Sequence, residues 1–305
     1  MASVTLVESA KLSLDMLVAG VIENIVTVNP IYDLLPFAGI EGNALSYNRE
    51  NALGDVQFLG VGGTITAKAA ATFTKVTSNL TTIVGDAEVN GLIQATRSNY
   101  TDQQAAQVAS KAKSLGRKYQ DNMITGDGTA DTFIGLLALT PAGQKVTPQT
   151  NGQVLSFDIM DQLMDLVKDK DGQVDYFMMP ARTIRAFMGL LRALGGASVN
   201  EVITLPGGRQ VPHYRGVPIF RNDFIPVNQT QGATNTCTTI FAGTFDDGSE
   251  SHGISGLTAS QESGIKVKSI GESETKDESI TRVLFYCGFA LFSELGIASA
   301  SGITN

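Results

Sequence analysis

Only two histidines, His213 and His252, could supply acid–base chemistry near neutral pH in this sequence of 305 residues. His252 follows a serine-rich, acidic stretch, DGSESHG at residues 247–253, so a serine and a carboxylate are its neighbours along the chain. A catalytic triad requires these groups to meet in space, which neighbours in sequence do not establish. No Gly-x-Ser-x-Gly elbow is present. We therefore expect no catalytic residues, and we expect the scattered carboxylates to be solvated charges.

Cysteine and glycine patterns give no metal or cofactor site. Cys237 and Cys287 lie far apart, without a Cys-x-x-Cys motif or metal-ligand spacing. Cys287 falls in the apolar segment RVLFYCGFALF, so a buried free thiol is expected, in keeping with a reducing cytoplasm. The glycines at 54–63 could suggest a phosphate-binding loop, but no Gly-Lys-Ser/Thr follows and no G-x-G-x-x-G opens a helix.

The overall charge argues against a nucleic-acid-binding protein. The net charge is −8, the sequence pI is about 4.8, and no long basic run occurs. Affinity for phosphates comes from clustered Lys and Arg, so strong binding to DNA is not expected. The N-terminus lacks the pattern of a signal peptide, and no run of about 18 apolar residues exists, so no membrane partner is expected.

The chain is organised around a long helix predicted over Thr101–Met123. Its apolar residues recur at steps of three and four and therefore share one stripe. They are Ala105, Val108, Ala109, Ala112, Leu115, Tyr119 and Met123. The glycines at 126 and 128 end the helix, which at ~1.5 Å per residue is a rod of about 36 Å. Because the stripe is narrow and its residues are small, we expect the rod to lie across a sheet or a neighbouring chain.

Two extended segments precede this helix. Residues 5–27 have the pattern of an amphipathic helix, either an arm that lies on another surface or a helix docked on its own domain. Residues 44–84 contain two strand-like stretches, ALSYNRE and TFTKVTSNLTTIV, on either side of a glycine-bearing tip. So long an excursion is uncommon within one compact domain.

A mixed α/β domain is predicted over residues 152–263. It comprises a helix over 157–170 capped by Ser156, a strand over 174–179, a helix beginning at Pro180, and strands at 210–214, 217–220 and 238–242. Residues 264–292 then predict a second long hairpin, with strands at 265–270 and 280–289 around the charged tip GESETKDES. The last residues, SELGIASASGITN, are expected to return through the first domain.

In this order the motifs resemble the major capsid proteins of tailed bacteriophages, the Hong Kong 97-type fold. The resemblance covers nearly the full length. It rests on the helix followed by ITGDGTADTFIGLL, the strand and helix VDYFMMPARTIRAFMGLL, the segment RGVPIF, the strand TTIFAGTFDDG, and the hairpin ending in VLFYCGFALF. It implies an α+β fold with an N-terminal arm (1–43), an extended β-hairpin E-loop (44–80), a peripheral P-domain with the spine helix (81–151), an axial A-domain (152–263), a long P-domain hairpin (264–292) and a C-terminal return segment (293–305).

The function implied by the resemblance is structural. Copies would self-assemble into hexamers and pentamers of an icosahedral capsid, formed in the host cytoplasm and located in the virion. The expected partners are other copies, a portal, a separate scaffolding protein and decoration proteins, with double-stranded DNA enclosed but not specifically bound. A separate scaffold, or none, is expected because the sequence passes from Met1 straight into the arm, without the long leading segment of many relatives.

Two charged groups are the predicted contacts between subunits, one in the E-loop and one at the tip of the later hairpin. They comprise Arg49, Glu50, Lys68 and Lys75, followed by Glu272, Glu274, Lys276, Asp277 and Glu278. Some relatives crosslink an E-loop lysine to a neighbour's asparagine, and Lys68 and Lys75 are the candidates by position.

Two alternatives remain open. An encapsulin-type shell of a cellular compartment shares the fold and would bind a cargo tail, whereas a capsid needs a portal and packaged DNA. An unrelated α/β enzyme would need a pocket of clustered titratable groups, which the sequence does not show.

Overall fold

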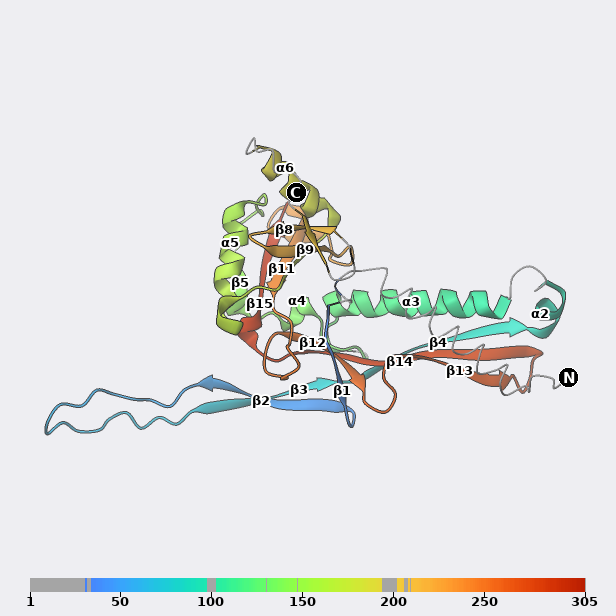
Figure 1. Ribbon diagram of the computed structural model, residues 1–305, viewed down its shortest axis with the longest axis horizontal. Coiled ribbons are helices and arrows are strands. Elements are labelled where there is room, and N and C mark those ends of the chain that lie inside the picture. Colours follow the sequence, from blue (N-terminus) through green and yellow to red (C-terminus); the bar gives the residue numbers. More distant parts are fainter. Residues whose placement is uncertain are drawn as a thin grey trace.

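The molecule is elongated, with one upright unit standing on a long lower layer (Figure 1). The computed structural model describes residues 31, 34–97, 103–129, 131–146, 148–193, 202–205, 208 and 210–304. The amphipathic helix expected over residues 5–27 lies outside these residues. The lower layer extends from a projecting hairpin at one end to a second hairpin and the short helix α2 (Gly91–Arg97) at the other.

A five-stranded sheet forms the lower layer, and β14 (Glu278–Leu291) is its central strand. β14 pairs antiparallel with β4 (Thr81–Asn90), β13 (Ile265–Glu272) and β12 (Ile254–Ala259), and β1 (Phe37–Ile40) adds to β12 in parallel. The predicted hairpin over 264–292 is therefore confirmed. Alternate β14 residues, such as Val283, Phe285 and Cys287, enter the core on one face of this sheet.

The long helix α3 (Gln103–Thr125) covers that face, as predicted for a rod lying across a sheet. Val108, Ala112, Leu115 and Tyr119 are buried in the same core. The helix ends at Thr125, and the next residue is a glycine at a position where no side chain fits. A Cβ atom on Gly126 would lie 2.2 Å from the carbonyl oxygen of Phe133.

The upright unit is an eight-stranded mixed sheet. Its order is β5 (Lys145–Val146), β15 (Ile297–Ile303), β11 (Thr234–Gly243), β6 (Tyr176–Met179), β9 (Val217–Arg221), β8 (Gln210–Tyr214) and β7 (Val202–Thr204), and β10 (Gln229–Gln231) pairs with β11. Successive side chains of β6 point to opposite faces of the sheet, and each face belongs to a different core. Tyr176 and Met178 face the core that includes α3, whereas Phe177 and Met179 face a second core. The short helix α4 (Leu136–Leu139) and the turn η2 (Ala142–Gln144) connect α3 to this sheet.

Two helices, α5 (Phe157–Leu166) and α6 (Ala181–Ala193), cover the face of the second core. The cap at Ser156 is confirmed, since its hydroxyl accepts a hydrogen bond from the Ile159 backbone N–H at 3.3 Å. The predicted extension of α5 to residue 170 is wrong. The helix ends at Leu166 because Val167 is extended, with a ψ angle of 113°, and the chain then turns at η3 (Lys170–Gly172), where Lys170 and Asp171 adopt φ angles of 47° and 57°.

Sheet pairing crosses the predicted boundaries at both ends of the second domain. β12 lies within the predicted span 152–263, yet it pairs with β14 and β1 in the lower sheet. The expectation that the last residues return through the first domain is wrong, because β15 lies between β5 and β11 in the upright sheet.

The excursion over residues 44–80 is a hairpin of β2 (Ala44–Ala52) and β3 (Thr72–Asn79), as predicted. These two strands form a sheet of their own, and the connecting loop reaches well beyond the rest of the molecule (Figure 1). In the described part of the chain, no helix is long and apolar enough to cross a membrane.

Candidate assembly surfaces

The base of the projecting hairpin is fixed to the turn after β14. The Tyr47 hydroxyl donates to the carbonyl oxygen of Leu291 at 2.6 Å, and its ring packs edge-on against Phe292. Arg49 Nε donates to the Phe292 carbonyl oxygen at 2.9 Å, and Arg49 Nη1 pairs with Glu294 Oε1 at 2.7 Å. The Arg49 side chain is only 16% exposed, so it fixes the direction in which the hairpin projects.

The other charged residues of the hairpin point elsewhere. Asn48 is opposite Lys75 in the β2–β3 register, and alternation places Glu50 on their face, away from the anchored face that holds Arg49. Lys68 is exposed in the loop. Glu50, Lys68 and Lys75 are therefore available to another chain, and their pairing or crosslinking between subunits stays a prediction.

The Gln57 side chain links the two sides of the hairpin loop, in addition to a backbone hydrogen bond from Asp55 to Ala69. The Gln57 amide nitrogen donates to the Thr64 carbonyl oxygen, and its amide oxygen accepts from the backbone N–H groups of Thr66 and Ala67 at 2.9 and 2.8 Å. Around this clamp, large apolar side chains face solvent. They are Leu53, Val56, Phe58, Leu59, Val61 and Ile65, with Phe73 on β3. The loop thus carries large apolar side chains that the described part of the chain does not cover.

The tip of the β13–β14 hairpin lies at the opposite end of the lower layer (Figure 1). Lys276 pairs with Glu278 at 3.7 Å, and the Asp277 carbonyl oxygen accepts from the Gly91 N–H at the start of α2. Glu272 and Glu274 are exposed. The two predicted groups of charges are therefore not brought together within one chain, and any meeting between them requires a second copy.

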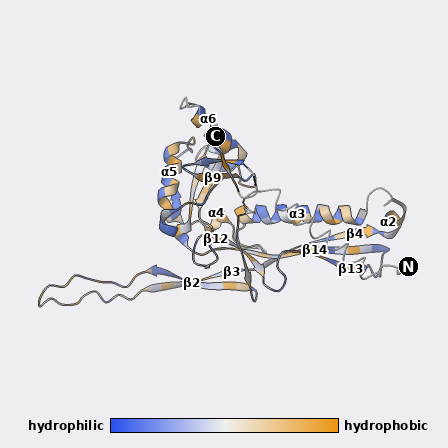
Figure 2. Ribbon diagram, in the orientation of Figure 1, coloured by the Kyte–Doolittle hydropathy of each residue, from blue (hydrophilic) through white to orange (hydrophobic). Residues whose placement is uncertain are grey.

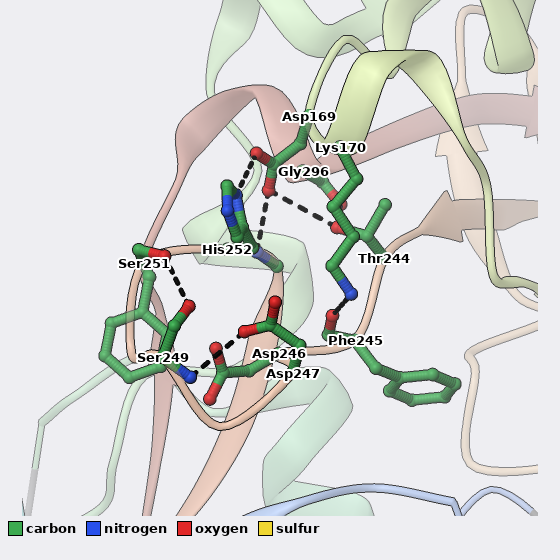
Figure 3. Close-up of polar contacts among 12 residues, drawn as sticks. Asp169, Lys170, Thr244, Phe245, Asp246, Asp247, Ser249, Ser251, His252 and Gly296 are labelled. Atoms are coloured by element: carbon green, nitrogen blue, oxygen red, sulfur yellow. Dashed lines mark hydrogen bonds and ion pairs between the residues drawn. The ribbon is translucent and has the colours of Figure 1, made fainter.

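A buried polar junction that the sequence did not reveal joins the two sheets (Figure 3). Asp169 is 8% exposed, and its carboxylate accepts hydrogen bonds at 2.8 Å from His252 Nδ1 and from the Gly253 backbone N–H. The Thr244 hydroxyl lies at 3.5 Å from the same carboxylate. These donors belong to the connection from β11 to β12. The Asp169 backbone N–H also bonds to Leu295, in the connection from β14 to β15.

The junction is not a catalytic triad. Asp169 holds His252 Nδ1 as a triad carboxylate would, but no serine hydroxyl of the described chain bonds to His252 Nε2, and those of Ser249 and Ser251 bond to each other (Figure 3). The carboxylate partner of His252 is 83 residues away in sequence, which only the folded chain reveals. No group of three or more metal-ligating side chains occurs among the described residues.

Both cysteines are buried free thiols, as predicted for Cys287. Burial raises the pKa of Cys287 to about 12, so its reactive thiolate form is suppressed.

A projecting hairpin, a sheet crossed by one long helix and an upright mixed sheet together define the Hong Kong 97-type class of shell proteins. The chain resembles the holo-SrpI encapsulin complex from Synechococcus elongatus PCC 7942 with a TM-score of 0.70 and 19% identity, over 90% of this chain and 87% of that chain. For the capsid of cyanophage A-1(L) the TM-score is 0.65 at 13% identity, with coverages of 90% and 93%. For the capsid of a native GTA particle the TM-score is 0.62 at 14% identity, over 90% of this chain and 89% of that chain. Identities this low establish the fold alone.

Residues 89–295, more than half of the chain, match the family of SrpI-like type 2A encapsulin shell proteins, and the chain belongs to that family. A comparison with curated protein sequences gave no match. Capsid-like shell proteins self-assemble into oligomeric shells, and they are structural proteins. The family therefore confirms the prediction that this protein is not an enzyme.

Proposed function

We propose that this protein is the subunit of a closed cellular compartment of the encapsulin type, which encloses a protein cargo. The observation that carries the proposal is the family match over residues 89–295. The fold is shared by encapsulins and capsids and does not distinguish them. The family match favours the compartment over the tailed-phage capsid, because the matched family is one of encapsulin shell proteins. The portal, the scaffolding protein and packaged double-stranded DNA belong to the capsid alternative.

The single chain supports assembly through what it leaves exposed. Phe58 and Val61 at the hairpin loop are fully exposed, although the loop is held in shape by Gln57. Burying a large apolar side chain contributes roughly 1.5–3 kcal/mol, which the free subunit does not obtain from these residues. A second copy covering the loop would supply that stabilisation, and the anchor at Arg49 would set where the neighbour lies.

The test is the composition of the purified particles. The full chain is expressed, and particles are isolated by sedimentation, treated with nuclease and protease, and then imaged by electron cryomicroscopy. We expect closed shells with all vertices equivalent and without nuclease-protected duplex DNA. Shells with a distinct portal vertex and protected DNA of uniform length would instead show a capsid, and a chain that stays monomeric at high concentration would contradict both.

A further inference from the structure

The two helices on the upright sheet carry opposite charges on their outer faces. α5 contains Asp158, Asp161 and Asp165 and no Lys or Arg, and α6 contains Arg182, Arg185 and Arg192 and no Asp or Glu. The spacings place each trio on one face of its helix, opposite the buried residues. We call these faces the acidic stripe and the basic stripe. They extend over about 10 Å and about 15 Å at ~1.5 Å per residue.

The stripes point outward because the inner faces of both helices belong to the second core. Ile159 and Leu163 of α5 and Phe187 of α6 are buried against the same face of the sheet. The Phe157 and Phe187 rings are 6.2 Å apart, so the helices meet near the start of α5, while α5 runs along one edge of the upright unit and α6 over its top (Figure 1). In Figure 2, hydrophilic and hydrophobic residues alternate along both helices, as expected for elements with one buried face.

Within one chain, the stripes do not neutralise each other. Asp161 bonds to Tyr214 and Arg215, and Arg182 donates to the Thr236 carbonyl oxygen. Asp165, Arg185 and Arg192 have neither an ion pair nor a hydrogen bond among the residues that the structure describes. Nor does any described ion pair join α5 to α6, although the two helices meet at Phe157 and Phe187.

We propose that the basic stripe of one copy contacts the acidic stripe of the next copy, head to tail, around the ring that builds the shell. The inference rests on the proposed function, because it takes the partner to be a second copy of this chain. A surface that carries both signs in separate stripes complements itself, whereas a uniformly charged partner would be attracted by one stripe and repelled by the other. A head-to-tail contact that closes makes a ring in which every copy uses both stripes.

Charge reversal tests the contact with substitutions that favour helix formation. One variant carries Asp165→Lys in the acidic stripe and Gln162→Lys beside it, a second carries Arg185→Glu and Arg192→Glu in the basic stripe, and a third carries all four. Subunits are prepared free and assembled in low salt, and light scattering gives the lowest concentration at which shells form. A Lys113→Glu variant, which reverses an exposed residue of α3, is the matched control.

Each one-sided variant is expected to raise that concentration about tenfold or more, because like charges across an interface cost several kcal/mol. The four-substitution variant is expected to restore assembly, with the same weakening by salt as the unmodified chain. Circular dichroism of the free subunits shows whether each variant is folded.

One-sided variants that are folded and assemble like the unmodified chain would refute the contact. A four-substitution variant no better than the one-sided ones would refute it as well. Failure of the unmodified chain to assemble would contradict the proposed function itself, so the two failures are distinguishable.

Discussion

Replacing Asp169 should loosen the junction between the two sheets, and the contacts allow the loss to be estimated. Asp169→Ala removes both 2.8 Å hydrogen bonds, to the Gly253 N–H and to His252 Nδ1. Gly253 is buried, so its N–H is left without a partner, and a hydrogen bond to a charged group contributes about 1.5–3 kcal/mol. His252 is 38% exposed and can bond to water instead, so its share is only about 0.5–1 kcal/mol. The expected loss is therefore about 2–4 kcal/mol.

Asp169→Asn provides the comparison that isolates the contribution of the charge, because asparagine keeps the shape of the side chain and can keep both hydrogen bonds. The asparagine oxygen can accept from the Gly253 N–H, and its amide group can donate to a neutral His252 Nδ1. Only the contribution of the charge is lost, so a cost of about 1 kcal/mol is expected. Asp171→Asn is the control, because Asp171 is exposed and asparagine tolerates its positive φ.

The assay is urea unfolding of free subunits, followed by both fluorescence and circular dichroism to check that the transition has two states. With a slope of about 3 kcal/mol per molar urea, Asp169→Ala should lower the midpoint by about 1 M and Asp169→Asn by roughly a third of that. An alanine variant within about 0.5 kcal/mol of the unmodified chain, or an asparagine variant as damaged as the alanine one, would refute the reasoning.

Three further outcomes are expected. Phe58→Ser with Val61→Ser should leave the urea midpoint of free subunits unchanged and sharply reduce assembly, and equal assembly would show that the loop does not lie on a neighbour. The hydrogen bond from Arg282, and its charge, hold the pKa of Asp86 below the usual 3.8. Because the pKa of Asp86 is lower in the folded chain, its carboxylate stabilises the fold above pH 3.8, and this stabilisation is lost as the pH falls toward the folded pKa. Asp86→Asn should therefore flatten the decline in stability below about pH 4, measured by urea unfolding at several pH values. Free subunits should show no affinity for duplex DNA near physiological salt in an anisotropy titration, and micromolar, salt-sensitive binding would identify the exposed cations of α3 as a DNA-binding face.

Local periodicity was sufficient to predict the elements that bury one face. The stripe from Val108 to Met123 predicted α3 and its place across a sheet, because a helix with one apolar face must cover an apolar surface. The Ser156 cap and the stop at Gly126 were likewise predictable, since both depend on residues within a few positions of the helix end.

Strand partners and polar contacts across the chain were not predictable in this way. Nothing local in the sequence of β15 determines whether it joins the lower or the upright sheet, because pairing is decided by residues as distant as those of β11 and β5. Arg49 illustrates the same limit. Its charge suggested a contact between subunits, but the β2–β3 register turns it toward Phe292 and Glu294 of its own chain, whereas Glu50, one residue later, faces outward.

The positions of these contacts separate the stability of the subunit from the stability of the shell. The Asp169 junction lies where both strand connections pass between the sheets, so a change there should weaken the contacts that hold the two units together. The hairpin loop and the exposed stripe residues, which are Asp158, Asp165, Arg185 and Arg192, contribute little to the folding of the chain that carries them, because their side chains face solvent. Substitutions of the first kind should change the urea midpoint and assembly together, whereas those of the second kind should change assembly alone. A subunit built this way can fold before it meets its neighbours, and the contacts that form the shell can be weakened without unfolding it.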